Sequence, residues 1–122
     1  MTINEDVFLE RYNKLNEHQK EAVDTIYGPV MVIAGPGTGK TEVLSLRIAN
    51  LLRSEAQVQP SEILCLTYTE EATSSMRKRL VQVAGTAAHR VNICTFHAFC
   101  NNVIQNNSEL FSLRSIRTIR HL

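Results

Sequence analysis

The residues with the clearest chemical potential lie together in the run AGPGTGKT, residues 34–41. Its spacing matches the phosphate-binding loop G-x-x-x-x-G-K-[ST], except that the first position is alanine. Glycine lets the backbone curl around an anion with no Cβ between an amide and an oxygen, and Gly37 and Gly39 serve that curl. The sequence therefore predicts a loop that binds a polyphosphate.

The other residues of this loop have complementary roles. Pro36 has no N–H, so the amides from Gly37 to Thr41 form the expected cradle. Lys40 brings a point charge to the outer phosphates, and the Thr41 hydroxyl is available to Mg²⁺. We therefore predict Lys40 and Thr41 as catalytic candidates and Thr41 as the metal-binding residue. The alternative is a glycine-rich turn from strand to helix that contains Lys-Thr by chance.

The carboxylate that normally also holds the metal is not found. The chain has two aspartates, Asp6 and Asp24, and neither ends an apolar strand. Hydrolysis of a nucleotide needs such an acid and a group that orients water. We expect weak binding of nucleotide and Mg²⁺, without useful turnover by these residues alone.

Alternating strands and helices are expected to position the loop. Asn16 and Gln19 have the spacing of a capping box, which marks the start of a helix. The expected elements are a helix over 17–26, a buried strand over 29–34, a helix over 39–53, a strand over 63–66, a helix after Thr69, a strand over 91–95 and a helix from 96. Three strand–helix alternations imply right-handed βαβ units and a parallel α/β sheet.

Two of these helices have further expected features. In the helix after Thr69, acids fill the first turn, the last turns are basic and an apolar stripe faces the core. The acids are Glu70 and Glu71, the basic residues are Arg77, Lys78 and Arg79, and the apolar stripe is Ala72, Met76, Leu80 and Val83. In the helix from 96 the apolar positions are Phe96, Phe99, Cys100 and Val103, of which both phenylalanines are expected in the core.

Length and composition limit the size and class of the protein. The chain has 122 residues, 43% of them hydrophobic, and a formal charge of +1. This is enough for one domain with a packed core, and it provides no overall field for an anionic partner. The longest apolar run, 30–34, is too short for a membrane helix, and the acidic start MTINEDVFLE does not resemble a signal peptide. We expect a cytoplasmic protein.

Two smaller features remain. The cysteines at 65, 94 and 100 lie in apolar stretches without metal-ligand spacing, so we expect reduced core thiols. The tail from Leu113 repeats Leu-x-x-Ile-x-x-Ile-x-x-Leu with three interleaved arginines. It is either a basic amphipathic helix or a solvated end.

Four motifs together resemble a known family. They are LNEHQ at 15–19, the loop ending in Gly39-Lys40-Thr41, LTYT at 66–69 with Ala72 after it, and TFH at 95–97. In this order and spacing they resemble the first motifs of superfamily 1 DNA helicases of the UvrD, Rep and PcrA type, over about residues 15–107. The resemblance implies the N-terminal portion of a P-loop NTPase (RecA-like) domain, with residues 108–122 an uncertain tail.

The resemblance also implies roles for single residues. Gln19 would read adenine, which makes ATP the nucleotide, with its helix cap as the alternative role. Thr67 and Tyr68 would touch single-stranded DNA, and Thr95 and His97 its backbone. The alternatives are a half-buried aromatic at Tyr68, a helix cap at Thr95 and a polar helix face at His97. The candidate nucleotide-binding residues are Gln19, Ala34, Gly35, Pro36, Gly37, Thr38, Gly39, Lys40, Thr41 and Glu42.

Some positions depart from the family. Glu70-Glu71 stands where Asn-Lys or a similar pair is usual, and Glu42 stands where arginine is usual. Acids beside a proposed DNA path oppose phosphate binding. The family's Asp-Glu motif, second RecA-like domain and helical subdomains follow the point where this sequence ends. The strand that carries the Asp-Glu motif would lie between strand 29–34 and the other two.

These features lead to a ranked expectation. The chain is expected to be an N-terminal, ATP-binding fragment of a 3′–5′ DNA helicase, and its open sheet edges would favour pairing with another copy. A non-catalytic nucleotide-binding or interaction module is the alternative. Gln19, the TFH motif and the lack of a guanine-reading Asn-Lys-x-Asp argue against an unrelated P-loop kinase or GTPase.

Overall fold

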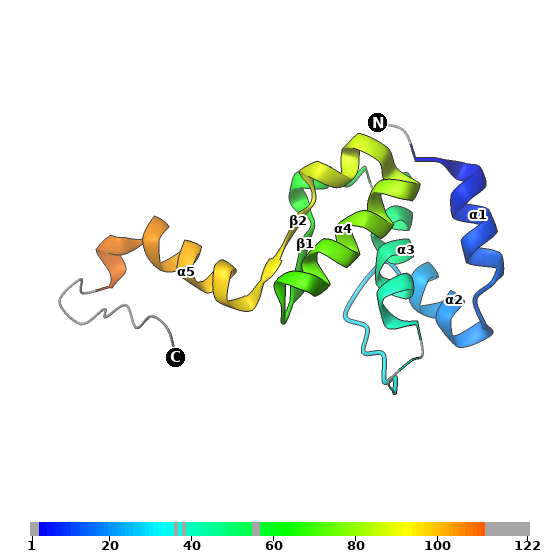
Figure 1. The fold of residues 1–122 in the computed structure, drawn as a ribbon, viewed down its shortest axis with the longest axis horizontal. Coiled ribbons are helices and arrows are strands. Elements are labelled where there is room, and N and C mark those ends of the chain that lie inside the picture. Colours follow the sequence, from blue (N-terminus) through cyan, green and yellow to red (C-terminus); the bar gives the residue numbers. More distant parts are fainter. Residues whose placement is uncertain (1–2, 36, 38, 55–56, 112–122) are drawn as a thin grey trace.

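Five α-helices and a two-stranded parallel sheet make up the described part of this computed structural model, residues 3–35, 37, 39–54 and 57–111 (Figure 1). The helices are α1 (Glu5–Asn13), α2 (Glu17–Asp24), α3 (Lys40–Arg53), α4 (Glu70–Ala84) and α5 (Phe96–Asn106), and the strands are β1 (Leu64–Thr67) and β2 (Asn92–Thr95). Short 3₁₀ turns are η1 (Pro60–Glu62), η2 (Gly85–Arg90) and η3 (Ser108–Leu110). The chain is thus a mixed α/β structure.

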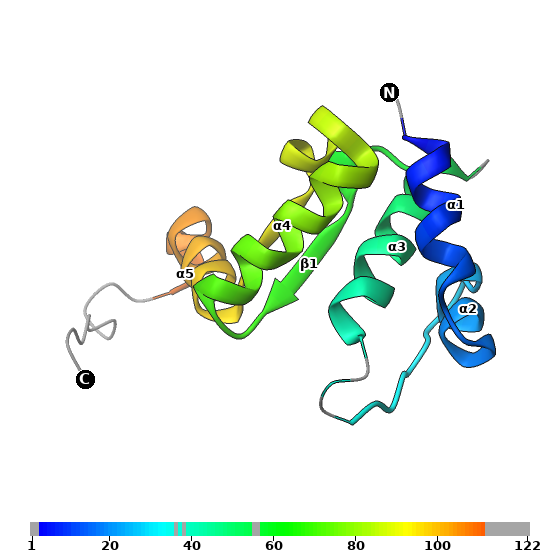
Figure 2. The same ribbon diagram turned by 45° about the vertical axis from the view of Figure 1, so that its right-hand side comes forward.

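The sheet is one β1–α4–β2 unit. Its strands pair in parallel from Leu64 with Asn92 to Thr67 with Thr95, so both strands end at the same edge. The helix α4 lies against one face of the sheet (Figure 2). Alternate residues of the strands are buried, as a sheet covered on one face requires.

The core lies mainly between α3 and α4. Leu46 of α3 and Leu80 of α4 are fully buried there, and α1 and α2 add Phe8 and Val23. Both views place α1 and α2 on the side of α3 away from the sheet, whereas α5 extends away from the body (Figures 1 and 2). The helix α5 contains no buried residue.

Most predicted elements form. The Asn16–Gln19 capping box is present at the start of α2, although that helix ends at Asp24 rather than 26. The predicted strands over 63–66 and 91–95 and the helix over 39–53 lie within one residue of β1, β2 and α3. Thr69 caps α4 as predicted, by accepting a hydrogen bond from the Ala72 N–H at 3.0 Å.

The predicted buried strand over 29–34 is wrong. This segment has no regular structure, and Met31 and Ile33 are 86% and 92% exposed. A strand needs a neighbour for its backbone N–H and C=O groups. Within the described residues, β1 and β2 pair with each other only, so the apolar run has no strand to join.

The predicted basic end of α4 is also wrong. The helix continues to Ala84, because Leu80 and Val83 extend its buried stripe, and it ends at Gly85, whose φ of +57° suits glycine. The basic residues 77–79 therefore lie within the helix. Arg77 donates hydrogen bonds to the carbonyls of Ala88 at 2.6 Å and Val91 at 3.1 Å, which fastens η2 to α4.

Three residues expected in the core are instead exposed: Ala72, Phe96 and Cys100. The last two lie on α5, which projects from the body and has little to pack against. Cys65 is buried as expected, and this burial raises the pKa of its thiol. All three cysteines are free.

Some expectations fall outside the described residues. These are the amphipathic tail from Leu113 and the loop residues Pro36 and Thr38. None of the described helices is both long enough and apolar enough to cross a bilayer.

Candidate nucleotide site and strand-end surface

A cleft of about 500 Å³ lies between α2, α3 and the segment that leads into the loop. Gln19, Gly35 and Lys40 give it polar groups, and Ala22 and Val43 belong to its apolar wall. Clefts of this size and composition are typical sites for small-molecule ligands.

Glycine shapes the end of the loop. Gly39 is the N-cap of α3, and its φ of +75° is a left-handed conformation that other residues rarely adopt. Its carbonyl accepts the Val43 N–H at 3.1 Å, which closes the first helical turn. Gly39 has no side chain to cap this helix, and backbone N–H groups at the start of a helix are donors from which an anion can accept.

Four of the predicted loop residues lie around this end. Ala34 and Gly35 line the cleft together with Lys40, the exposed first residue of α3, and Thr41 follows it half-buried. The described residues contain no group of three or more His, Cys, Asp or Glu that could hold a metal ion.

Gln19 combines a helix cap with a place beside the loop. Its backbone N–H donates to Asn16 Oδ1, and its side-chain Oε1 accepts the Asn16 N–H, both at 2.9 Å. Its other amide atom, Nε2, would lie 3.6 Å from a Cβ built on Gly39. The cap is therefore formed, and the amide nitrogen lies next to the loop.

Two polar residues that the sequence analysis did not single out fasten α2 to α3. Arg47 donates to the Thr25 carbonyl and Asn50 Nδ2 to the Val23 carbonyl, both at 3.0 Å. The buried Arg47 Nε has no hydrogen-bond partner among the described residues. Their only signal in the sequence is that they interrupt the apolar spacing of α3.

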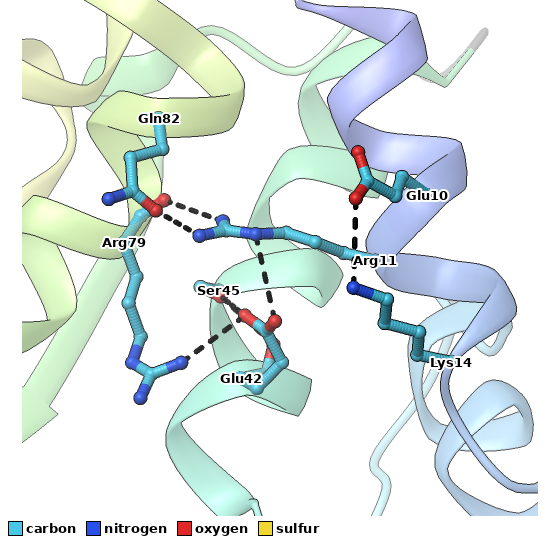
Figure 3. Close-up of polar contacts among 7 residues, drawn as sticks. All are labelled: Glu10, Arg11, Lys14, Glu42, Ser45, Arg79 and Gln82. Atoms are coloured by element: carbon cyan, nitrogen blue, oxygen red, sulfur yellow. Dashed lines mark hydrogen bonds and ion pairs between the residues drawn. The ribbon is translucent and has the colours of Figure 1, made fainter.

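Glu42 does not line the cleft. Its carboxylate lies between Arg11 of α1, at 3.7 Å, and Arg79 of α4, at 3.6 Å (Figure 3). Ser45 Oγ also donates to Glu42 Oε1 at 3.2 Å. The structure thus places this candidate nucleotide-binding residue in a contact among three helices.

The strand-end surface, Tyr68 with Phe96, lies at the carboxyl edge of the sheet. Tyr68 is 86% exposed and Phe96 41%, and their ring centroids are 5.1 Å apart with planes tilted by 34°. Each follows the last residue of a strand, and the parallel register brings them together. That shared position after a threonine was the signal that could have identified Phe96.

The threonines at this edge are turned inward. The Thr67 hydroxyl is 2.6 Å from that of Thr73 and donates to the Thr69 carbonyl at 3.2 Å. The Thr95 hydroxyl caps α5 by accepting the Ala98 N–H at 3.1 Å. His97 is exposed in the first turn of α5, and Glu70 and Glu71 are exposed in the first turn of α4.

Comparison with known proteins gives a consistent result. A family model described as UvrD/REP helicase N-terminal domain matches residues 15–121. The chain is similar to ATP-dependent DNA helicase PcrA of Staphylococcus aureus (strain Mu50 / ATCC 700699), with 36% identity over 107 residues, which cover 88% of this chain and 14% of that protein. PcrA of Staphylococcus epidermidis (strain ATCC 12228 / FDA PCI 1200) is 37% identical over 105 residues, with coverage of 86% and 14%. The chain therefore spans about 14% of the length of these curated relatives.

Proposed function

This chain belongs to the UvrD/REP helicase N-terminal family, and from that membership we propose that it is the ATP-binding N-terminal part of an ATP-dependent 3′–5′ DNA helicase with a P-loop, RecA-like fold. The observation that carries the proposal is the position of Gln19, whose Nε2 would lie 3.6 Å from a Cβ on the loop residue Gly39. A primary amide can both donate to and accept from an adenine edge. One cleft thus has a group for the base and a loop for the phosphates.

In this proposal the loop binds the triphosphate and the amide selects the base. Lys40 and the first-turn amides of α3 receive the phosphates, and the Thr41 hydroxyl is the protein ligand of Mg²⁺. Mg²⁺ neutralises phosphate charge when it is bound with ATP. Oε1 of Gln19 accepts one backbone N–H and has a second lone pair, so in this proposal it also accepts from the adenine N6 amine while Nε2 donates to N7.

Single-stranded DNA is the proposed partner of the strand-end surface. The exposed ring of Tyr68, supported by Phe96, offers a face on which a base can stack, and such stacking is worth about 1–3 kcal/mol per base. His97 would contact the backbone. Thr67 and Thr95 remain proposed contacts, although their hydroxyls bond within the protein.

A cytoplasmic location and pairing with another copy through open sheet edges also remain proposals. A non-catalytic nucleotide-binding module is the second candidate. It shares the cleft and the loop with the helicase proposal and differs in having no DNA-dependent activity.

Calorimetric titration of the chain with MgATP tests the nucleotide site. We expect Lys40→Ala to weaken binding at least about tenfold, the usual effect of losing a hydrogen bond to a charged group. Lys20→Ala is the matched control, because this lysine lies 5.4 Å over the Tyr12 ring and does not line the cleft. Equal binding by wild type and Lys40→Ala, or no binding by either, would overturn the proposal.

Base selection is tested with Gln19→Ala, which removes both the donor and the acceptor of the amide. Wild type should prefer ATP to GTP, and the variant should lose that preference. For DNA, fluorescence anisotropy with oligo(dT) should show weaker binding by Tyr68→Ala. Tyr27→Ala is the control, since Tyr27 is 74% exposed and belongs to the segment between α2 and α3, outside both strands. Unchanged binding by Tyr68→Ala would remove the stacking role.

A further inference from the structure

The contact of Glu42 with two arginines has a consequence for the loop. We propose that Glu42 is a positioning residue, which holds the first turn of α3 in place through Arg11 of α1 and Arg79 of α4. The inference rests on the proposed function insofar as that turn carries Lys40 and Thr41. It assigns Glu42 a role through these residues and no contact with the nucleotide.

The two ion pairs lie at the N-terminal end of α3, next to the loop. Glu42 is in the first turn of α3, two residues after Lys40. Its Oε2 lies 3.7 Å from Arg11 Nε and its Oε1 3.6 Å from Arg79 Nη1, with 24% of the side chain exposed (Figure 3). One carboxylate thus joins the start of α3 to two other helices.

Arg11 is itself held in place. Its Nη1 donates to the backbone carbonyl of Arg79 at 3.0 Å, and its Nη2 donates to Gln82 Oε1. Only 18% of its side chain is exposed. These bonds hold the guanidinium against α4, so Glu42 pairs with an arginine that is itself bonded to that helix.

The described residues between α2 and α3 form no helix or strand. The segment over 29–34 that leads into the loop has no regular structure, and Gly39 provides no side-chain cap to α3. The contacts of α3 itself therefore contribute to the position of its first turn. On that turn, Val43 packs into the core, and Glu42 forms the ion pair with Arg11 of α1.

The chain contains a matched control for this inference. Arg53, the last residue of α3, pairs with Glu5 of α1 at 2.8 Å. Glu5 and Glu42 each lie in the first turn of their own helix and each join α1 to α3. They differ in which end of α3 they hold.

Amide hydrogen exchange of the full chain tests the inference without nucleotide. We expect exchange of the Val43 amide, which closes the first turn, to become about fivefold faster in Glu42→Gln, as the loss of two partly exposed ion pairs predicts. Arg79→Gln should give a smaller increase while leaving Glu42 and its interaction with the helix dipole intact. Glu5→Gln should leave Val43 unchanged and speed exchange only at the far end of α3.

A double variant separates positioning from a simple loss of charge. Glu42→Arg combined with Arg79→Glu keeps one carboxylate between two arginines and moves it from α3 to α4. It should bring Val43 exchange back toward wild type, whereas Glu42→Arg alone should not. Wild-type exchange at Val43 in both Glu42→Gln and Arg79→Gln, or equal acceleration by Glu5→Gln, would overturn the inference.

Titration with MgATP measures whether the Glu42 contacts affect nucleotide binding. Glu42→Gln should weaken binding about threefold to fivefold, and Glu5→Gln should not change it. If wild type bound no MgATP, the proposed function would fail, and the exchange data would still decide whether Glu42 positions the turn. If wild type bound and Glu42→Gln bound equally, the positioning role would fail and the proposed function would stand.

Discussion

Ile33 and Ile93 each occupy a segment for which the sequence predicts a strand, yet Ile33 is 92% exposed and Ile93 6%. The run around Ile93 forms β2 because β1 lies beside it in register. The run around Ile33 has no such neighbour among the described residues. A continuous apolar pattern thus indicates that a segment is fit to be buried in a sheet, and burial itself depends on a second segment far away in the chain.

The loop region and the strand ends also differ in how they are held. Every ion pair found within the described residues joins residues of α1, its C-cap Lys14, α3 or α4, and none involves a strand or α5. At the strand ends, buried hydroxyls and helix caps hold the backbone. We therefore expect charge to matter for the loop region and hydrogen bonds for the strand ends.

The largest expected effect concerns the two isoleucines. Ile93→Ala should lower the free energy of unfolding by about 3 kcal/mol, since it leaves a cavity under α4. Ile33→Ala should change it by less than about 0.5 kcal/mol, because it removes an exposed side chain. Urea unfolding followed by circular dichroism measures both. A similar large loss in both variants would mean that the run around Ile33 is buried after all.

Two threonines should show the next largest difference. Thr67→Val should cost about 1.5 kcal/mol, because it removes the hydrogen bonds of a buried hydroxyl, while the Thr69 carbonyl keeps its bond from Thr73. Thr41→Val should alter the free energy of unfolding by less than about 0.5 kcal/mol, since no described residue bonds to its hydroxyl, and should act on Mg²⁺-dependent nucleotide binding instead. The same unfolding measurement checks stability. If Thr67→Val were neutral, the inward role of that hydroxyl would be disproved.

Elements that depend on neighbouring residues could be predicted from the sequence. Three such features involve residues only a few positions apart in the chain: the Asn16–Gln19 capping box, the Thr69 cap and the apolar spacing of α3. The strand over 29–34 and the core position of Phe96 were wrong because both depended on distant partners. The helix α1 was not anticipated, because its one buried residue, Phe8, gives a weak pattern.

In the candidate sites, too, features set by neighbouring residues could be predicted from the sequence, and features set by distant residues could not. The loop was predicted from its spacing alone and stays a prediction, and Gln19 Nε2 would lie 3.6 Å from a Cβ on its residue Gly39. The pairing of Tyr68 with Phe96 needed the register of β1 and β2. The ion pairs of Glu42 needed α1 and α4 to be packed around α3, which no local pattern reports.

Helix caps should affect the two regions equally. Asn16→Ala removes the acceptor that caps α2 beside the cleft, and Thr95→Ala removes the one that caps α5 at the strand ends. Each should cost about 1 kcal/mol, the usual value for such a cap. Thermal unfolding of the two variants measures this. A much larger cost at Asn16 would show that its capping box also supports the loop.

The smallest expected effect is the pH dependence of the pair between Glu5 and Arg53. The hydrogen bond from Arg53 holds the pKa of Glu5 below its ordinary value in the folded chain. Its stabilisation is therefore fully present above the unfolded pKa, about 4.3, and is lost as the pH falls through the lower folded value. Because about half of the Glu5 side chain is exposed, screening limits the contribution to about 0.3 kcal/mol.

A titration of the Glu5 side-chain carboxyl by NMR measures that pKa directly. In Arg53→Gln it should return to the ordinary value, and the acid-dependent part of the stability should disappear with it. The chemical shifts of β1 and β2 should not follow this titration, since no ion pair of the described residues reaches the strands. An unchanged Glu5 pKa in Arg53→Gln would show that the pair is not formed, and shifts in the strands that track it would show that the two regions are coupled through charge.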